Sequence, residues 1–302
     1  MRHGFYTIIR PVLLVTLLMQ MAACNRPSHE MPRGTRSVRD DLGRDVRLDR
    51  APRRIVSLAP SLTEMLYAVG AGAQVVGVTS YCDYPPEVSQ KTVVGDLVTP
   101  NIERILSLKP DLVLISVEGN SQRTFSSLEQ LGVRLFVSNP RDIEGVYKSM
   151  RDIGALLGEE KRTKSILDSL HAEEGRLRDL RGTGRPSVLM LLSLQPLMAA
   201  GNSTFIDEVI TLAGGRNAAE ALRGSYPTLN RELLLRMNPD IVLYPDDMGV
   251  DETQVRRGFP EWRDLDAMKR GAVYRINADL FLRPGPRVFM AAAQLQEMLA
   301  RR

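Results

Sequence analysis

Histidine and cysteine are scarce in this 302-residue sequence, which has only His3, His29, His171, Cys24 and Cys82. A zinc site needs several such ligands close together, and a Ser or Cys nucleophile needs a histidine as its base. His3 and His29 stand in an N-terminal stretch that we expect to lie outside the folded part, so His171 remains alone. The sequence therefore predicts no metal site and no catalytic triad. Acid–base chemistry by two carboxylates, as in glycoside hydrolysis, stays open.

A glutamate recurs at the same place in two similar segments. NIERILSLKPDLVLI spans 101–115 and NRELLLRMNPDIVLY spans 230–244, so aligned residues stand 129 positions apart. Each segment predicts a helix that begins with Asn-x-Glu. The helix is followed by Pro-Asp and then by a buried strand. Asn is favoured at helix N-caps and Glu in first turns, and such junctions are frequent in α/β proteins. The repeat indicates either two similar lobes or local convergence.

The N-terminus has the features of an export signal. MRHGFYTIIR is basic, and PVLLVTLLMQ is apolar but short for a membrane span. The stretch ends in MAAC, which resembles the lipobox of bacterial lipoproteins, where the cysteine is acylated. We therefore expect residues 1–23 to be a lipoprotein signal, Cys24 to carry lipid and anchor the chain outside the cell or in the periplasm, and 24–37 to be a polar tether. Ordinary secretory cleavage is the alternative.

The net charge and the cysteine content limit the kinds of partner that we expect for this protein. The formal charge of +4 falls to about +2 if Arg2 and Arg10 are removed with the signal. Such a small net charge does not indicate a basic surface that binds nucleic acid. If Cys24 carries lipid, Cys82 has no disulfide partner. We therefore expect a lipid-anchored globular monomer.

Strand and helix patterns alternate along the rest of the chain, which predicts parallel sheets built from βαβ units. A hairpin turning at Leu42-Gly43 opens a first α/β lobe at 38–157. Its last helix, within 142–158, has Asp142 as a candidate N-cap and Gly158 as a C-terminal stop. A second lobe spans 186–302. The expected fold class is α/β with two Rossmann-like lobes.

One long helix is expected between the two lobes. Residues 159–181 place Ile166, Leu167, Leu170, Leu177 and Leu180 near one face, and about 23 helical residues span about 34 Å. We therefore assign 158–185 as a linking helix that joins the lobes as a rigid rod.

Three stretches carry a family resemblance: RIVSLAPSLTEMLYAVGAGAQVVGVTSYCDYPPEV, NIERILSLKPDLVL and RPGPRVFMAAAQL. They are similar to the substrate-binding proteins of bacterial ABC importers for vitamin B12, haem and ferric siderophores, and most similar to the cobalamin-binding members. The resemblance covers 38 to the C-terminus. It implies a non-enzymatic protein that holds one ligand between two lobes, with no further cofactor.

The resemblance also gives the repeated glutamates a role. In the B12 system, one glutamate on each lobe docks onto arginines of the two permease subunits, which work with ATPase subunits. The matching residues here are Glu103 and Glu232. A twofold-symmetric permease requires two similar surfaces from a single chain.

Ligand contacts are implied at seven positions. Tyr81 matches a tyrosine of the ligand cleft and Asp279 a polar contact. Tyr226 stands in place of a tryptophan, and Met198 in place of a phenylalanine. Three further tryptophans of the family are replaced by Leu97, Ser116 and Leu280, which could equally be lobe packing.

Other ligands and roles remain open. Haem is the main alternative, because Tyr81 or Tyr226 could ligate ferric iron. A ferric siderophore would favour a basic cleft, for which Arg283 and Arg287 are candidates unless they brace the final helix. Cys82 is expected to be a small buried residue rather than a cobalt ligand. A lipid-anchored enzyme or a sensor domain is less favoured.

Overall fold

The structure of the protein is a computed structural model that describes residues 35–182, 184–251, 253–255 and 260–301. The predicted signal, Cys24 and most of the tether lie outside these residues. Within the described ranges, no helix is long and apolar enough to cross a membrane.

The first sheet is parallel throughout and follows the order β5-β4-β3-β6-β7. Its central strands are almost entirely buried, as expected for a parallel sheet with helices on both faces. The antiparallel hairpin of β1 and β2 precedes it, with Gly43 in a left-handed conformation at the predicted turn. The strands are β1 (Arg36–Arg39), β2 (Asp45–Leu48), β3 (Ile55–Ser57), β4 (Val75–Val78), β5 (Thr92–Val93), β6 (Leu112–Ser116) and β7 (Leu135–Ser138).

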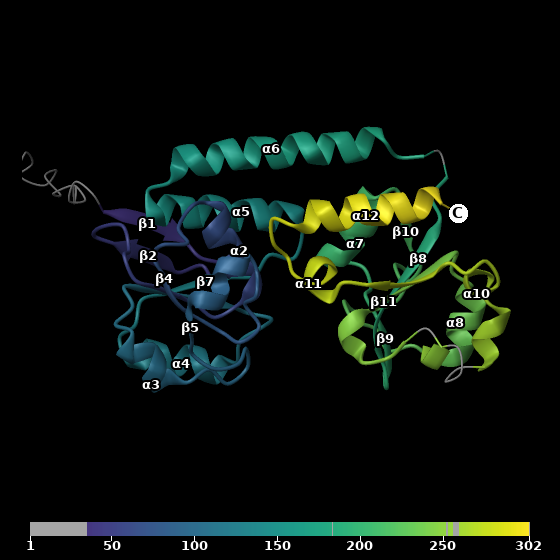
Figure 1. The fold of residues 1–302 in the computed structure, drawn as a ribbon, viewed down its shortest axis with the longest axis horizontal. Helices are drawn as coiled ribbons and strands as arrows, with labels where there is room; N and C mark the ends of the chain where they lie inside the picture. The colour runs from purple at the N-terminus through teal and green to yellow at the C-terminus, as the bar shows by residue number, and fades with distance from the viewer. Residues whose placement is uncertain (1–34, 183, 252, 256–259, 302) are drawn as a thin grey trace, which may run out of the picture. The chain divides into compact units, whose positions relative to one another are not determined.

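Three helices of this lobe, which begin at Ile102, Gln122 and Ile143, have side-chain N-caps. Asp142 accepts a hydrogen bond from the amide of Gly145, and Gly158 ends the same helix in the left-handed region, so both predicted signals are confirmed. Figure 1 shows these helices around the first sheet. They are α2 (Pro60–Ala68), the 3-10 helix η1 (Pro86–Gln90), α3 (Ile102–Ser107), α4 (Gln122–Gln130) and α5 (Ile143–Leu157).

The second sheet has the parallel order β10-β8-β11-β12, and β9 pairs antiparallel with β8. Its strands are β8 (Ser187–Leu194), β9 (Leu197–Ala199), β10 (Arg216–Asn217), β11 (Ile241–Pro245) and β12 (Val273–Ile276). The surrounding helices are α7 (Phe205–Leu212), α8 (Arg231–Met237), α10 (Asp266–Lys269), α11 (Ala278–Phe281) and α12 (Val288–Ala300), with 3-10 turns η2 (Asp246–Met248) and η3 (Pro260–Asp264). The predicted fold class, two α/β lobes with parallel sheets, is confirmed.

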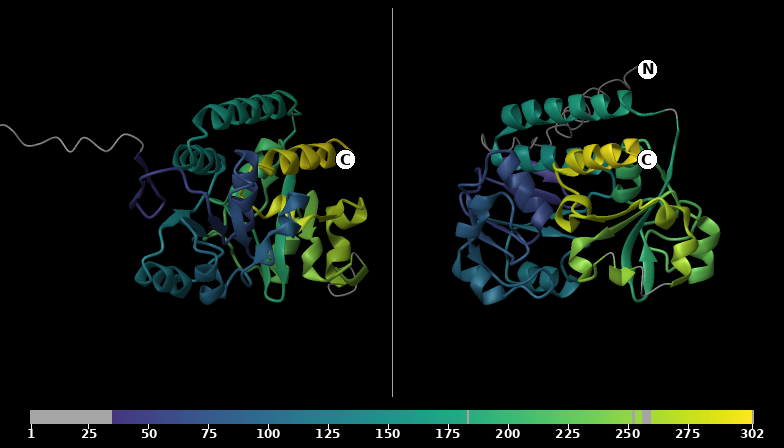
Figure 2. Two further views of the ribbon diagram at one scale, coloured as in Figure 1. Left: turned by 60° about the vertical axis from the view of Figure 1, so that its left-hand side comes forward. Right: turned by 45° about the vertical axis from the view of Figure 1, so that its right-hand side comes forward.

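The long helix predicted between the lobes is α6 (Glu160–Asp179), and at 20 residues it spans about 30 Å. It packs on α5 of the first lobe and on α7 and α12 of the second. Figures 1 and 2 show α6 running alongside helices of both lobes. His171 lies on this helix with its ring 4.1 Å from the ring of Tyr147. The helix is therefore packed against both lobes along its length.

The two repeated segments fold into equivalent helix–strand units, α3–β6 and α8–β11. Asn101 and Asn230 are the N-caps, and each side-chain oxygen accepts a hydrogen bond from the amide three residues on, at 2.8 and 2.7 Å. Lys109 and Asn238, also 129 positions apart, both have positive φ angles, 46° and 39°. The units thus match from the helix cap to the turn that enters the strand.

The two helix–strand units also form equivalent hydrogen bonds with neighbouring strands. Asp111 accepts a hydrogen bond from the amide of Arg54, which precedes β3, at 3.0 Å. Asp240 accepts one from the amide of Ser187, which begins β8, at 2.8 Å. Each aspartate therefore fixes the start of the neighbouring central strand, an arrangement that a local junction alone does not require.

Several short elements were not predicted from the sequence. They are β5, β9, β10, β12, α10 and α11, and all contain five residues or fewer. In addition, β1 begins at Arg36, two residues before the expected start of the first lobe at 38. Such short strands are stabilised by their neighbours in the sheet rather than by their own pattern.

Candidate functional site

The ligand contacts expected in the first lobe lie at the carboxyl ends of its parallel strands, where open α/β sheets bind ligands. Tyr81 follows β4 and is 56% exposed. Leu97 follows β5, and Ser116 is the last residue of β6; both are half-buried. We call this edge of the sheet, with its loops, the first carboxyl edge.

Asn120 fixes the loops of this edge. Its Nδ2 donates to the carbonyls of Leu58 and Leu97 at 2.9 and 2.7 Å, and its Oδ1 accepts from the amide of Ser116 at 2.8 Å. The side chain of Asn120 thus holds the loop of Leu97 in place.

The contacts expected in the second lobe lie at the equivalent edge, the second carboxyl edge. Met198 is on β9, which hydrogen-bonds with the segment 227–229. Tyr226 is next to that segment and 40% exposed. Asp279 and Leu280 are half-buried on α11, directly after β12. Met198 and Tyr226 are therefore neighbours, and Leu280 also packs against the core.

Tyr226 is close to charged groups of the other lobe. Burial raises the pKa of its hydroxyl above the ordinary value, Glu118 raises this pKa further, and Arg141 lowers it. Glu118 and Arg141 belong to the first lobe, so the two carboxyl edges approach each other here.

The arginines of the RPGPR turn are held by carboxylates. Arg283 donates to Asp83 at 2.6 Å, across the lobes, and also pairs with Asp279. Arg287 makes two hydrogen bonds to the buried Glu64 of α2, at 2.9 and 2.6 Å. These contacts support a bracing role for the turn, because both guanidinium groups are already neutralised.

These acidic partners were missed by the sequence analysis. Glu64 interrupts the apolar run SLTEMLYAVG, and a carboxylate inside an amphipathic helix was the available signal. Arg283 also donates to the backbone carbonyl of Tyr81 at 3.1 Å, so the brace contacts the loop that carries a predicted ligand contact.

Cys82 is buried, and its sulfur is within 3.2 Å of the hydroxyls of Thr63 and Thr79. Burial raises the pKa of this thiol above its ordinary value. Among the described residues, no group of three or more His, Cys, Asp and Glu side chains is placed to hold a metal ion. Cys82 thus has the small buried role expected from the sequence.

Glu103 and Glu232 are both exposed, in the first turns of α3 and α8. No hydrogen bond or ion pair to another described residue holds either carboxylate. Because their helices begin equivalent units of the two lobes, the two side chains occupy equivalent positions in their respective lobes. Both carboxylates are available to a partner.

This architecture of two α/β lobes with facing carboxyl edges defines a class of two-lobed binding proteins. The chain belongs to the periplasmic binding protein family, whose pattern matches residues 55–280, well over half of its length. This family comprises solute-binding proteins of ABC transporters and is not enzymatic. The protein is therefore a substrate-binding component of an ABC importer, which works with a permease and its ATPase.

Individual relatives agree with this assignment. The chain is 30% identical to an ABC transporter substrate-binding lipoprotein of Bacillus subtilis (strain 168), over 95% of both chains. It is 30% identical to the vitamin B12-binding protein of Photorhabdus laumondii, over 82% of this chain and 88% of that one. Its structure resembles the apo form of the periplasmic haem-binding protein RhuT from Roseiflexus sp. RS-1, with a TM-score of 0.76, 28% identity, and coverage of 82% and 98%.

Proposed function

We propose that the protein captures a corrinoid of the cobalamin class between its two carboxyl edges and delivers it to the permease. The observation that carries this proposal is the chemistry of the edges. Exposed tyrosines and half-buried aliphatic side chains lie at both edges, while Arg283 and Arg287 are neutralised by carboxylates. A broad macrocycle with amide substituents suits apolar walls with a few polar groups.

Two other ligand classes fit less well. An anionic ferric siderophore calls for unpaired cations, and Arg283 and Arg287, the two arginines of the RPGPR turn, are both paired. Haem is the second candidate, because the exposed Tyr81 could ligate ferric iron. The vitamin B12-binding relative supports the corrinoid, and the haem-binding structural neighbour supports this alternative.

Calorimetry and visible absorption can separate these ligands. We expect one cobinamide or cyanocobalamin per chain, and weaker binding by the double variant Tyr81→Ala/Tyr226→Ala. Loss of an aromatic wall should cost about 1–3 kcal/mol per residue. Leu180→Ala, an equally exposed residue after α6, is the control and should bind normally. The corrinoid assignment fails if haemin or a ferric siderophore saturates the protein while cobinamide gives no heat.

We further propose that Glu103 and Glu232 dock onto the permease, one on each subunit. Their exposure and equivalent placement support this role. The alternative is a favourable interaction with the helix dipole, about 0.3–1 kcal/mol each. For Glu103→Lys/Glu232→Lys, docking predicts normal ligand affinity but impaired uptake into proteoliposomes that contain the cognate permease, because like charges repel at the interface.

A matched control exists for this experiment. Glu160 is also an exposed glutamate in the first turn of a helix, α6. Glu160→Lys changes a helix dipole in the same way, so it should leave uptake unchanged. Full uptake by the Glu103→Lys/Glu232→Lys protein would remove the docking assignment.

We also propose that Cys24 carries the lipid anchor, since MAAC precedes a polar tether and the Bacillus relative is named a lipoprotein. Wild type should incorporate labelled palmitate and partition into detergent. Cys24→Ser should do neither, and equal labelling of this variant would contradict the anchor.

A further inference from the structure

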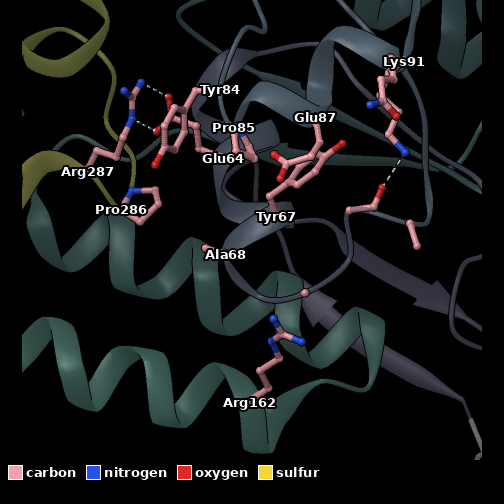
Figure 3. A pocket seen from close by; sticks show the side chains of 14 residues that line it. Glu64, Tyr67, Ala68, Tyr84, Pro85, Glu87, Lys91, Arg162, Pro286 and Arg287 are labelled. Atoms are coloured by element: carbon pink, nitrogen blue, oxygen red, sulfur yellow. Dashed lines mark hydrogen bonds and ion pairs between the residues drawn. The ribbon is translucent and has the colours of Figure 1, made fainter.

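A cavity lies next to the C-terminal end of α2. Its volume is about 690 Å³, within the range of small-molecule sites. Side chains of α2, η1 and the first turn of α6 line it, together with Pro286 and Arg287 of the second lobe. Figure 3 shows these residues around the space. None of the seven predicted ligand contacts lines this cavity.

On one side of the cavity, the charged side chains already pair with each other. Glu64 receives both of its hydrogen bonds from Arg287, whose guanidinium also lies 4.1 Å from the centre of the Tyr84 ring. This side can offer a ligand an aromatic and proline surface, but no unpaired charge.

The other side of the cavity has charges that no described residue neutralises. Lys91 donates to the carbonyl of Gly72 at 2.8 Å, which uses one of its three N–H groups. The guanidinium of Arg162 packs closely against Gly70, whose φ of 90° favours glycine at this position. Both cations converge on the turn 70–72, and neither they nor Glu87 form an ion pair with a described residue.

Tyr67 also lines this part of the cavity. Its hydroxyl oxygen is buried and has no hydrogen-bond partner among the described residues. Burial, and then the charge of Glu87, raise the pKa of this hydroxyl, so it stays protonated and is a donor without an acceptor. The ring is held against Gly72, where a Cβ atom would meet it. An unpaired buried donor is costly and is satisfied when a ligand supplies an acceptor.

We infer that this cavity is a second binding site, for an acidic amino acid. Lys91 and Arg162 match two carboxylates, Glu87 matches one ammonium group, and the Tyr67 hydroxyl donates to a carboxylate oxygen. The charges of the ligand and the site are then complementary in sign and number. A ligand here also contacts both lobes, through Tyr67 on one side and Pro286 on the other.

The test uses calorimetry on the full-length protein with three ligands of similar size. L-glutamate carries all three charged groups, glutarate lacks the ammonium group and L-glutamine lacks the second carboxylate. We expect one L-glutamate per chain, and binding of glutarate and L-glutamine at least about tenfold weaker, since a charged hydrogen bond contributes about 1.5–3 kcal/mol, or tenfold or more. No heat with L-glutamate, or equal affinity for the three ligands, overturns the proposal.

Variants locate the site. Arg162→Gln and Glu87→Gln should each weaken L-glutamate binding about tenfold or more, whereas Arg123→Gln, an exposed arginine on α4, should not. Tyr67→Phe removes the unpaired hydroxyl, so the free protein should keep its melting temperature while the affinity for L-glutamate falls. Unchanged affinity in both Arg162→Gln and Glu87→Gln would place glutamate elsewhere and refute this site. Cobinamide affinity, measured on the same variants, separates this result from the fate of the corrinoid proposal.

Discussion

The ion pair between Glu64 and Arg287 joins the two lobes, and removing one partner should be costly. The Glu64 side chain is only 2% exposed and accepts two hydrogen bonds from Arg287 at 2.9 and 2.6 Å. Arg287→Met leaves this carboxylate buried without its main partner, which typically costs about 3–5 kcal/mol. Arg283, at 3.5 Å, remains as a weaker partner, so we expect the lower end of this range, about 3 kcal/mol.

Urea unfolding followed by circular dichroism measures this loss. In a chain of this size, about 3 kcal/mol corresponds to a fall in melting temperature of about 6–12 °C. The double variant Glu64→Gln/Arg287→Met should be more stable than Arg287→Met alone, because no buried charge is left unpaired. A loss below about 1 kcal/mol for Arg287→Met, the value of an exposed pair, would refute the reasoning.

Three further predictions concern other contacts of the fold. Asp111→Ala and Asp240→Ala should each lower the free energy of unfolding by about 1–3 kcal/mol, and urea titrations that differ strongly between them would contradict the equivalence of the two units. Asn120→Ala should speed hydrogen exchange of the amides at 96–99, while unchanged exchange would mean that its side chain does not hold this loop. Burial raises the pKa of Glu208, so its stabilising contribution is full below the ordinary value of about 4.3 and is lost as pH rises through the raised pKa. Glu208→Gln, which can still accept the hydrogen bond from the amide of Ile143, should therefore reduce the decline of stability between pH 4 and 7, and an unchanged pH profile would be evidence against this assignment.

The features with strong local patterns were predictable from the sequence. The Asn-x-Glu starts at 101 and 230, the Asp142 cap and the Gly158 stop all use local hydrogen bonds or backbone geometry that the residue type determines. The apolar face of 159–181 likewise indicated one long helix. Such signals act within a few residues and do not depend on the rest of the fold.

The remaining features depend on distant partners. The strands β5 and β10 contain two residues each and exist through pairing with β4 and β8. The partner of Arg287 is Glu64, 223 positions away, and no local pattern gives that choice. The cavity beside Tyr67 likewise depends on Arg162, which the turn between α5 and α6 brings to Gly70.

The continuous helix α6 has a consequence for the kinetics of ligand exchange. Wide opening of two lobes needs a few loop residues that absorb large changes in φ and ψ, and α6 instead crosses from one lobe to the other while packing on helices of both. We therefore expect ligand association without a slow closing step. Spontaneous dissociation, in turn, must break the ligand contacts with little help from lobe separation, so residence times in the free protein should be long. The transporter would shorten them by pulling on the lobes when it binds, which would couple release to arrival at the membrane.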